Sequence, residues 1–228
     1  MTSILQRIRQ RLQGQPPSEP LDPEGASGVA LRGHRGYVGG HWEEIGQLQF
    51  NFLCDQGLRP EHILLDIACG SLRLGVKAIP YLDKGHYLGI EKERSLIEAG
   101  LEQELGQELR LAKAPIILED RWFRFERFGV EVDMAIAQSL FTHLPPKQIE
   151  LCLSQLRPVL KASATLYATF HEVPEERRNP DRPHDHGFFA YTRDQMEAFG
   201  EHQGYAVSYI GNWGHPRGQV MVAYQPFP

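Results

Sequence analysis

Residues 63–75 read ILLDIACGSLRLG, and this stretch decides the fold. The apolar run 63–67 predicts a buried strand, and the small residues after it predict a turn at which a ligand can approach the backbone closely. A helix-like pattern then opens at Ser71 and is expected to continue to Ile79, before Pro80. A strand, a turn of small residues and a helix in this order are typical of open α/β sheets, which bind ligands at the carboxyl ends of their strands.

Four further strand-like runs follow, separated by helix-like patterns. The runs cover residues 86–90, 116–119, 134–138 and 165–170; helices are expected over 93–105, after Pro145 and Pro146, and after the capping box of Thr192 and Gln195. This alternation predicts parallel βαβ units. Two last runs, 205–210 and 220–224, are joined without room for a helix and predict an antiparallel hairpin. We therefore expect an α/β, three-layer Rossmann-like fold with a seven-stranded, mostly parallel sheet whose last strand is antiparallel.

The chain of 228 residues suits one domain with an N-terminal helical extension. Residues 1–33 are expected to be an arm and a Pro/Gly-rich linker, because residues 15–33 carry four prolines and three glycines with little apolar periodicity. Residues 34–60 are expected to hold a covering helix, since apolar residues recur at helical spacing over 41–56. Residues 61–228 form the expected main domain, with a lid insert near residues 172–190.

Composition and charge exclude several classes of protein. A net charge of -5 gives no general attraction for a polyanion, so no nucleic-acid partner is expected. The three cysteines form no CxxC pair, which argues against a disulfide framework or a zinc site and favours a reducing cytoplasm. No apolar run reaches the roughly 18 residues of a membrane span. The basic amphipathic residues 1–14 fit a frayed arm, or a contact with a membrane surface or partner.

The turn after the first strand resembles the first motif of class I S-adenosylmethionine-dependent methyltransferases, in which an acidic residue is followed by small residues at alternate positions. Asp66, Ala68 and Gly70 stand in that register. The resemblance implies that Asp66 organises the loop and the methionine ammonium of the methyl donor, and that Gly70 leaves space for the donor. Ala68 replaces the commoner glycine, and we expect its φ to be negative because of its methyl group.

Later strand ends supply the other residues expected to bind S-adenosylmethionine. Glu91 ends the second strand about 20 residues beyond Gly70, where a carboxylate can accept ribose hydroxyls. The resemblance implies that Asp120 accepts from the adenine amino group, with Trp122 or Phe123 against the ring; the alternative is a solvated turn residue. It also implies that Gln138 and Ser139 flank the donor, and the remaining expected contacts are Tyr37, Arg73 and Lys92.

A nicotinamide-binding Rossmann domain would share the acidic residue at the second strand. Its turn needs three glycines to admit a pyrophosphate, however, and Ala68, Gly70 and Gly75 have unsuitable spacing. The resemblance to methyltransferases therefore outweighs the dinucleotide alternative.

The acceptor side of the site is less defined by the sequence. His143, His171 and His215 fall at the expected strand ends or hairpin turn and are candidate general bases. The alternatives are that they orient a loop, end a strand or shape a turn. Further expected acceptor contacts are Trp42, Phe141, Phe188, Trp213 and Arg217. No metal site is expected, because the adjacent His184, Asp185 and His186 lack a third ligand at helical or strand spacing.

The sequence predicts an enzyme that transfers a methyl group from S-adenosylmethionine to an oxygen or nitrogen of a small-molecule acceptor, leaving S-adenosylhomocysteine. The main alternative is a non-catalytic donor-binding module that acts as a regulator or partner, and a weaker one is a protein methyltransferase. DNA adenine methylation is disfavoured, because no Asn/Asp-Pro-Pro-aromatic box follows the fourth strand. The acceptor's identity and the oligomeric state are not predicted.

Overall fold

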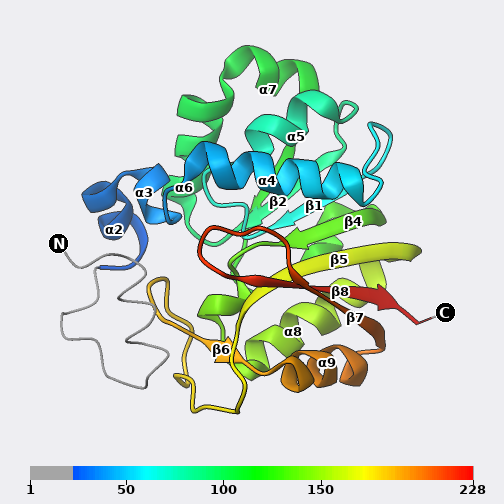
Figure 1. The fold of residues 1–228 in the computed structure, drawn as a ribbon. Helices are drawn as coiled ribbons and strands as arrows, with labels where there is room; N and C mark the ends of the chain where they lie inside the picture. Colours follow the sequence, from blue (N-terminus) through cyan, green and yellow to red (C-terminus); the bar gives the residue numbers. More distant parts are fainter. Residues whose placement is uncertain (1–22, 228) are drawn as a thin grey trace.

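Strand β1 (Leu64–Ile67) lies near the middle of an eight-stranded sheet in the computed structural model, which describes residues 23–227 (Figure 1). The strand order is β3-β2-β1-β4-β5-β8-β7, and β6 pairs with β5 outside this path. The other strands are β2 (Tyr87–Glu91), β3 (Ile116–Glu119), β4 (Val132–Ala137), β5 (Leu160–Glu172), β6 (Ala190–Tyr191), β7 (Tyr205–Asn212) and β8 (Val220–Pro226).

The predicted directions of the strands are confirmed. Strands β1 to β5 pair in parallel along the path, whereas β8 is antiparallel to both β5 and β7. The eighth strand, β6, was not predicted; it has only two residues, too few to show a pattern.

Helices cover both faces of this sheet, as the three-layer prediction requires. Figure 1 shows α4, α5 and α7 on one side of it and α8 and α9 on the other. Because successive residues of a strand point to opposite faces, Leu64 of β1 belongs to the core under α4 and α5, while Leu65 belongs to the core under α8 and α9. The helices are α2 (Gly25–Arg32), α3 (His34–Tyr37), α4 (Trp42–Asp55), α5 (Gly75–Tyr81), α6 (Arg94–Ala99), α7 (Gln107–Lys113), α8 (Pro146–Leu156) and α9 (Arg193–His202), with a π-helix at Gly100–Leu105 and 3-10 turns at Phe125–Phe128, Phe141–His143 and Arg157–Val159.

Several helix predictions are confirmed by the observed caps. Helix α4 covers the expected apolar stripe, and α8 begins with Pro146 in its first turn. At the start of α9 the Thr192 side chain accepts from the Gln195 backbone, and the Gln195 side chain accepts from the Thr192 backbone. The predicted helix over 93–105 is α6 followed by the π-helix, with the Glu93 side chain accepting from the Ser95 backbone at 3.1 Å.

Two predictions are wrong, one about the N-terminal segment and one about the helix that follows β1. The predicted linker contains helix α2 over residues 25–32, where Val29 is buried despite the surrounding glycines; residues 1–22 lie outside the described part of the chain. The helix expected from Ser71 begins only at Gly75, because Leu72 has a left-handed φ of 68° that interrupts helical backbone. It also runs one residue past Pro80.

Helix α7 was missed because none of its residues is buried and no apolar periodicity marks it. The lid insert predicted near 172–190 corresponds to residues 173–189, which contain no helix or strand and are called the β5–β6 segment below. Across the described residues, we find no helix with the length and hydrophobicity needed to cross a membrane.

Candidate functional site

A cavity of about 830 Å³ lies at the carboxyl ends of β1, β2, β4 and β5, where an open α/β sheet is expected to bind ligands. The turn after α3 and the β5–β6 segment also line it. All eleven residues predicted to contact the donor line this one cavity: Tyr37, Asp66, Ala68, Gly70, Arg73, Glu91, Lys92, Asp120, Trp122, Gln138 and Ser139.

The predicted acceptor residues are divided by the structure. His143, His171, Phe188 and Arg217 line the cavity. Four others do not: Trp42, Phe141, Trp213 and His215. Phe141 is fully buried in the core, Trp42 packs edge-on against His34, and Trp213 stacks on His215. These four side chains lie behind the lining of the cavity and do not form part of it.

The turn after β1 adopts backbone conformations that favour glycine. Gly70 has a φ of 55°, and a Cβ at this position would meet Val38 Cγ1 at 2.9 Å, so glycine is required for both conformation and space. Ala68 has a φ of 59°. The prediction of a negative φ at Ala68 is therefore wrong; the turn imposes a left-handed residue there, which costs about 1–2 kcal/mol for a side chain larger than hydrogen.

Left-handed backbone recurs at the other strand ends around the cavity. Phe123, beyond β3, has a φ of 58°, and Ser139, directly beyond β4, has a φ of 60°. Strained residues of this kind persist where the surrounding structure holds them, and they concentrate at ligand sites. Their distribution along three strand ends marks the same edge as the cavity.

Two buried carboxylates face the cavity from β1 and β2. Asp66 accepts a hydrogen bond of 2.6 Å from the Tyr87 hydroxyl, and burial raises its pKa to about 7 against the opposing effects of Tyr87 and Arg73. Glu91 accepts from three backbone N–H groups, those of Gly70 at 3.0 Å, Lys92 at 2.8 Å and Glu93 at 3.0 Å. Burial nevertheless raises the pKa of Glu91. An uncompensated negative charge at this edge therefore favours a cationic or hydrogen-bond-donating ligand.

Asp120 has a different environment, although it lines the same cavity. Its buried carboxylate accepts from the Trp122 backbone at 2.6 Å and from the guanidinium groups of Arg124 at 2.5 Å and Arg127 at 3.2 Å. Burial alone would raise the pKa of Asp120, but these donors outweigh it and lower the pKa. The carboxylate is thus occupied by its own loop, and an adenine amino group would have to displace one of these donors. Trp122 is exposed at the rim.

Gln138 is the centre of a buried polar network at the end of β4. Its Oε1 accepts from Arg73 Nη2 at 2.6 Å, which fixes the amide so that Nε2 donates to Ser139 Oγ at 2.7 Å and lies 3.0 Å from His215 Nε2. Three other members of the network were not predicted, namely Gln49, Thr169 and Gln219. They come from α4, β5 and the residue before β8, and no local motif marks them.

Two arginines hold the turn that follows α3. Arg73 Nη1 donates to the carbonyls of Val38 and Gly40, each at 3.1 Å, and Arg217 Nη2 donates to the carbonyl of Gly39. Burial, together with the neighbouring charge of Arg217, lowers the pKa of Arg73 to about 10. The turn at 38–40 is therefore tied both to the end of β1 and to the β7–β8 hairpin.

The three candidate histidines differ in which ring nitrogen is free. His143 Nδ1 lies 3.0 Å from the Gly187 carbonyl, which can only accept, so Nδ1 carries the proton and Nε2 keeps its lone pair. Both ring nitrogens of His215 have partners, the Gln138 amide at Nε2 and the Arg217 backbone N–H at Nδ1, so neither is available. His171 stacks on Phe188 with ring centroids 4.6 Å apart.

Burial is the largest effect on the pKa of each candidate histidine. It lowers the pKa of His143 to about 4 and those of His171 and His215 to about 3. All three imidazoles are therefore neutral at neutral pH.

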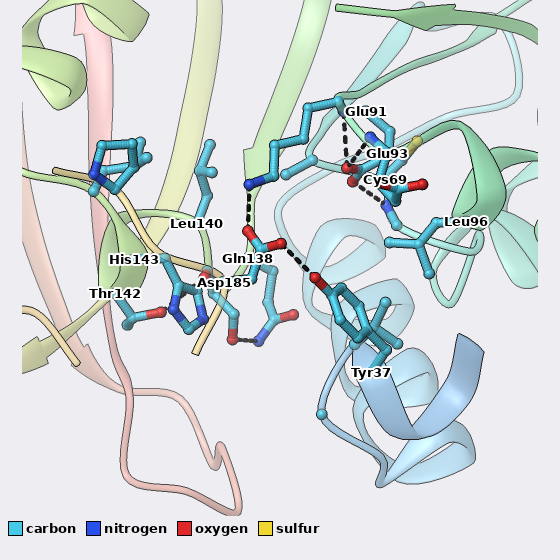
Figure 2. Close-up of a pocket in the computed structure, with 18 of the residues that line it drawn as sticks. Tyr37, Cys69, Glu91, Glu93, Leu96, Gln138, Leu140, Thr142, His143 and Asp185 are labelled. Carbon is cyan, nitrogen blue, oxygen red and sulfur yellow. Dashed lines mark hydrogen bonds and ion pairs between the residues drawn. The ribbon is translucent and has the colours of Figure 1, made fainter. Parts of the chain in front are cut away.

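Asp185 joins the β5–β6 segment to the rest of the cavity wall. Its carboxylate accepts from the Tyr37 hydroxyl, as Figure 2 shows, and forms an ion pair with Lys92. The Asp185 backbone also donates to Glu24 at 2.8 Å. Tyr37 and Lys92, both predicted donor contacts, are thus engaged in holding this segment. Among the described residues, no group of three or more His, Cys, Asp or Glu side chains is arranged to hold a metal ion.

Comparisons with known proteins agree on the fold. No model of a protein family matches the sequence. Magnesium protoporphyrin IX methyltransferase from Synechocystis PCC 6803, solved with bound SAM, superposes with a TM-score of 0.61 at 13% identity, covering 99% of this chain and 93% of that one. The S-adenosylmethionine-dependent methyltransferase from Clostridium acetobutylicum ATCC 824 gives 0.63 at 8% identity, covering 88% and 98%.

A third similar structure is the glycopeptide N-methyltransferase MtfA complexed with S-adenosyl-L-methionine. Its TM-score is 0.61 at 11% identity, and the match covers 80% of this chain and 94% of that one. The chain therefore has the Rossmann-like fold of S-adenosylmethionine-dependent methyltransferases, as its sequence motif predicts.

Replacing Asp185 by asparagine tests whether this residue closes the cavity. D185N loses the ion pair with Lys92 and weakens the contact with Tyr37, so amides of residues 184–188 should exchange with deuterium at least about tenfold faster than in the unchanged protein. The matched control is D181N in the same segment. Asp181 is 88% exposed, and its distance of 4.0 Å from Arg178 is long for an ion pair. Equal exchange in D185N and D181N would show that Asp185 does not hold the segment.

Proposed function

We propose that this protein is an S-adenosylmethionine-dependent methyltransferase that methylates an oxygen or nitrogen of a small molecule. The observation that carries the proposal is the convergence of Asp66, Glu91 and Gln138, from the ends of β1, β2 and β4, on one cavity beside the glycine turn. Residues that lie at three different strand ends in the sequence therefore line one cavity, as a donor site requires. The comparisons support the fold in which such sites occur.

The residues at the end of β1 fit a methionine group with its two charges. Asp66 is buried and held partly protonated near neutral pH, and the donor's ammonium would compensate its negative charge. Arg73 acts electrostatically on Asp66 and supplies positive charge for the donor's carboxylate; three of its roughly five N–H donors are used in hydrogen bonds with Val38, Gly40 and Gln138. Gly70 provides the space, because a side chain there would strike Val38.

Glu91 fits the ribose, with one refinement. A carboxylate offers about four acceptor positions, and three of those on Glu91 already receive backbone N–H groups. We therefore assign one ribose hydroxyl to the remaining position on Oε2, rather than both hydroxyls. Trp122, exposed at the rim, supplies a flat surface for the adenine ring.

The donor supplies an activated methyl group, whose bond to sulfur breaks with the electron pair going to sulfur. The acceptor's oxygen or nitrogen forms the new bond to carbon and loses its proton. The protein has to align the acceptor and exclude water. The β5–β6 segment, held by Asp185, supplies that enclosure.

His143 is the residue best placed to take the acceptor's proton. Its Nδ1 is fixed by Gly187, and its Nε2 has no other partner among the hydrogen bonds of the described residues. Although burial lowers its pKa to about 4, an attacking hydroxyl or amine becomes strongly acidic as the bond to carbon forms, so a weak neutral base suffices.

The alternative of a non-catalytic donor-binding module is favoured by one observation. All three cavity or near-cavity histidines have pKa values of about 3 to 4, well below the value near 7 that suits a general base at neutral pH. The two functions differ in whether a methylated product forms.

Calorimetric titration with S-adenosylmethionine, and separately with NAD, tests the proposed donor. We expect binding of S-adenosylmethionine and none of NAD, because the turn after β1 lacks the glycines that admit a pyrophosphate. Labelled methyl should then pass to a component of a small-molecule metabolite extract. Donor binding without any labelled product would favour the regulatory module, and the absence of donor binding would refute both.

Donor affinity should rise with pH through the titration of Asp66. Its pKa of about 7 means that the carboxylate is mostly protonated at pH 6 and ionised at pH 8, and only the ionised form attracts the ammonium. Affinity for S-adenosylmethionine should therefore increase about tenfold between these pH values. The charged or titratable groups facing Asp66 are Tyr87, Arg73, Glu91 and Cys69.

The control for this pH effect is D66N, whose amide cannot ionise. Its affinity should be lower at pH 8, and any pH dependence that it retains belongs to the donor's own amino group, which titrates in the same region. A pH dependence equal to that of the unchanged protein would remove Asp66 from the donor site.

Replacing His143 by asparagine tests its role in proton transfer. H143N keeps an N–H that can reach the Gly187 carbonyl but lacks Nε2, so methyl transfer to the extract should slow by about 100-fold or more while donor affinity is unchanged. The control is H202N, because His202 lies on α9 and its side chain is 68% exposed. Full activity in H143N would assign the proton to another acceptor.

A further inference from the structure

We propose that the methyl acceptor is an organic acid whose carboxylate binds Arg217 at the acceptor end of the cavity. This inference rests on the proposed methyl transfer and adds the chemical class of the acceptor. It depends on three features of the structure: a guanidinium that lacks an anionic partner, an aromatic wall beside it, and the engagement of two other cavity cations, Lys92 and Arg73, elsewhere.

The first feature is the incomplete set of partners around Arg217. Its Nη2 donates to the Gly39 carbonyl, while its Nε is buried and has no hydrogen-bond partner. Among residues 23–227, no carboxylate lies within ion-pair distance of Arg217. Arg217 as a whole is half-buried, but an unsatisfied buried donor such as its Nε indicates a missing partner.

The second feature is the engagement of two other cations that line the cavity. Lys92 is paired with Asp185, and Arg73 is bonded to Gln138 and to the turn at 38–40. Arg73 also interacts electrostatically with Asp66, whereas the pKa of Arg217 is lowered by burial alone. The positive charge of Arg217 is thus left for a ligand.

The third feature is the wall formed by His171 and Phe188. Their rings stack with centroids 4.6 Å apart, and Arg177 covers the Phe188 ring at 5.7 Å from its centroid. Arg217 is close enough to His171 to lower its pKa, so the guanidinium and this aromatic pair belong to the same part of the cavity. His171 is neutral and therefore adds no charge of its own to this wall.

These features together fit a carboxylate attached to a flat or apolar body. The carboxylate would accept charge-assisted hydrogen bonds from Arg217, which are shorter and stronger than bonds between neutral groups. The body would lie along Phe188 and Leu140, which both line the cavity. The donor half, with Asp66 and Glu91, carries the opposite charge and suits the donor's ammonium and hydroxyls instead.

Benzoate and benzamide are the probes for this site, because they match in shape and differ in charge. The protein is first saturated with S-adenosylhomocysteine, and each probe is then titrated while ligand resonances are followed by NMR. We expect benzoate to bind at least about tenfold more tightly than benzamide, as a charge-assisted hydrogen bond predicts. Equal affinities, or no binding of benzoate, would overturn the proposal.

Variants of Arg217 assign the preference to this residue. In R217Q the ratio of the two affinities should fall to about one, while R217K, which keeps a cation, should retain part of the preference. The matched control is R178Q, because Arg178 is 90% exposed on the β5–β6 segment and should leave the ratio unchanged. An unchanged ratio in R217Q would place the carboxylate elsewhere.

The affinity of each variant for S-adenosylhomocysteine separates this proposal from the proposed function. If R217Q loses as much affinity for that product as R73Q does, Arg217 belongs to the donor site and the acceptor proposal fails. If the unchanged protein does not bind the product at all, the methyltransferase proposal fails first. Retained product affinity with a lost preference for benzoate supports the carboxylate site and also shows that R217Q is folded.

Discussion

The bond from the Gly70 N–H to the Glu91 carboxylate is the contact on which the rest of the site depends. It joins the turn after β1 to the end of β2, at the point where two buried strands stop and their polar groups must find partners. Because Glu91 also accepts from the two residues that follow it, one side chain holds the backbone that follows both β1 and β2. The left-handed residues Ala68 and Leu72 are tolerated because this turn is held at both ends.

Much of the fold could be predicted because each strand carries its own pattern. The apolar runs and their order predicted the parallel sheet, and the carboxylates were found because Asp66 lies near the end of one such run and Glu91 directly follows another. Helix α2 was not found, since its stability comes from packing rather than from its glycine-rich sequence. The prediction for Ala68 failed for a related reason, because the φ of a turn residue depends on the strands that the turn connects.

The residues that were missed share a property: their roles arise only when distant segments meet. Gln49, Thr169 and Gln219 surround Gln138, but they are separated by tens of residues along the chain and belong to no motif. The three histidines appeared equivalent in sequence and became distinct through one carbonyl, that of Gly187, which fixes the tautomer of His143. The residues at the strand ends could therefore be predicted from the sequence. Their hydrogen-bonded partners on other segments could be identified only in the folded structure.

The two arginines that donate hydrogen bonds to the turn at 38–40 also bear on where the domain begins. A boundary placed at residue 61, where the strand pattern starts, would separate the carbonyls of Val38, Gly39 and Gly40 from Arg73 and Arg217. It would leave the buried Arg73 and the half-buried Arg217 without these hydrogen-bond acceptors and remove one wall of the cavity. The segment from α2 to α4 is thus part of the cooperative unit rather than an attachment to it, and a shortened chain would lose stability and ligand binding together.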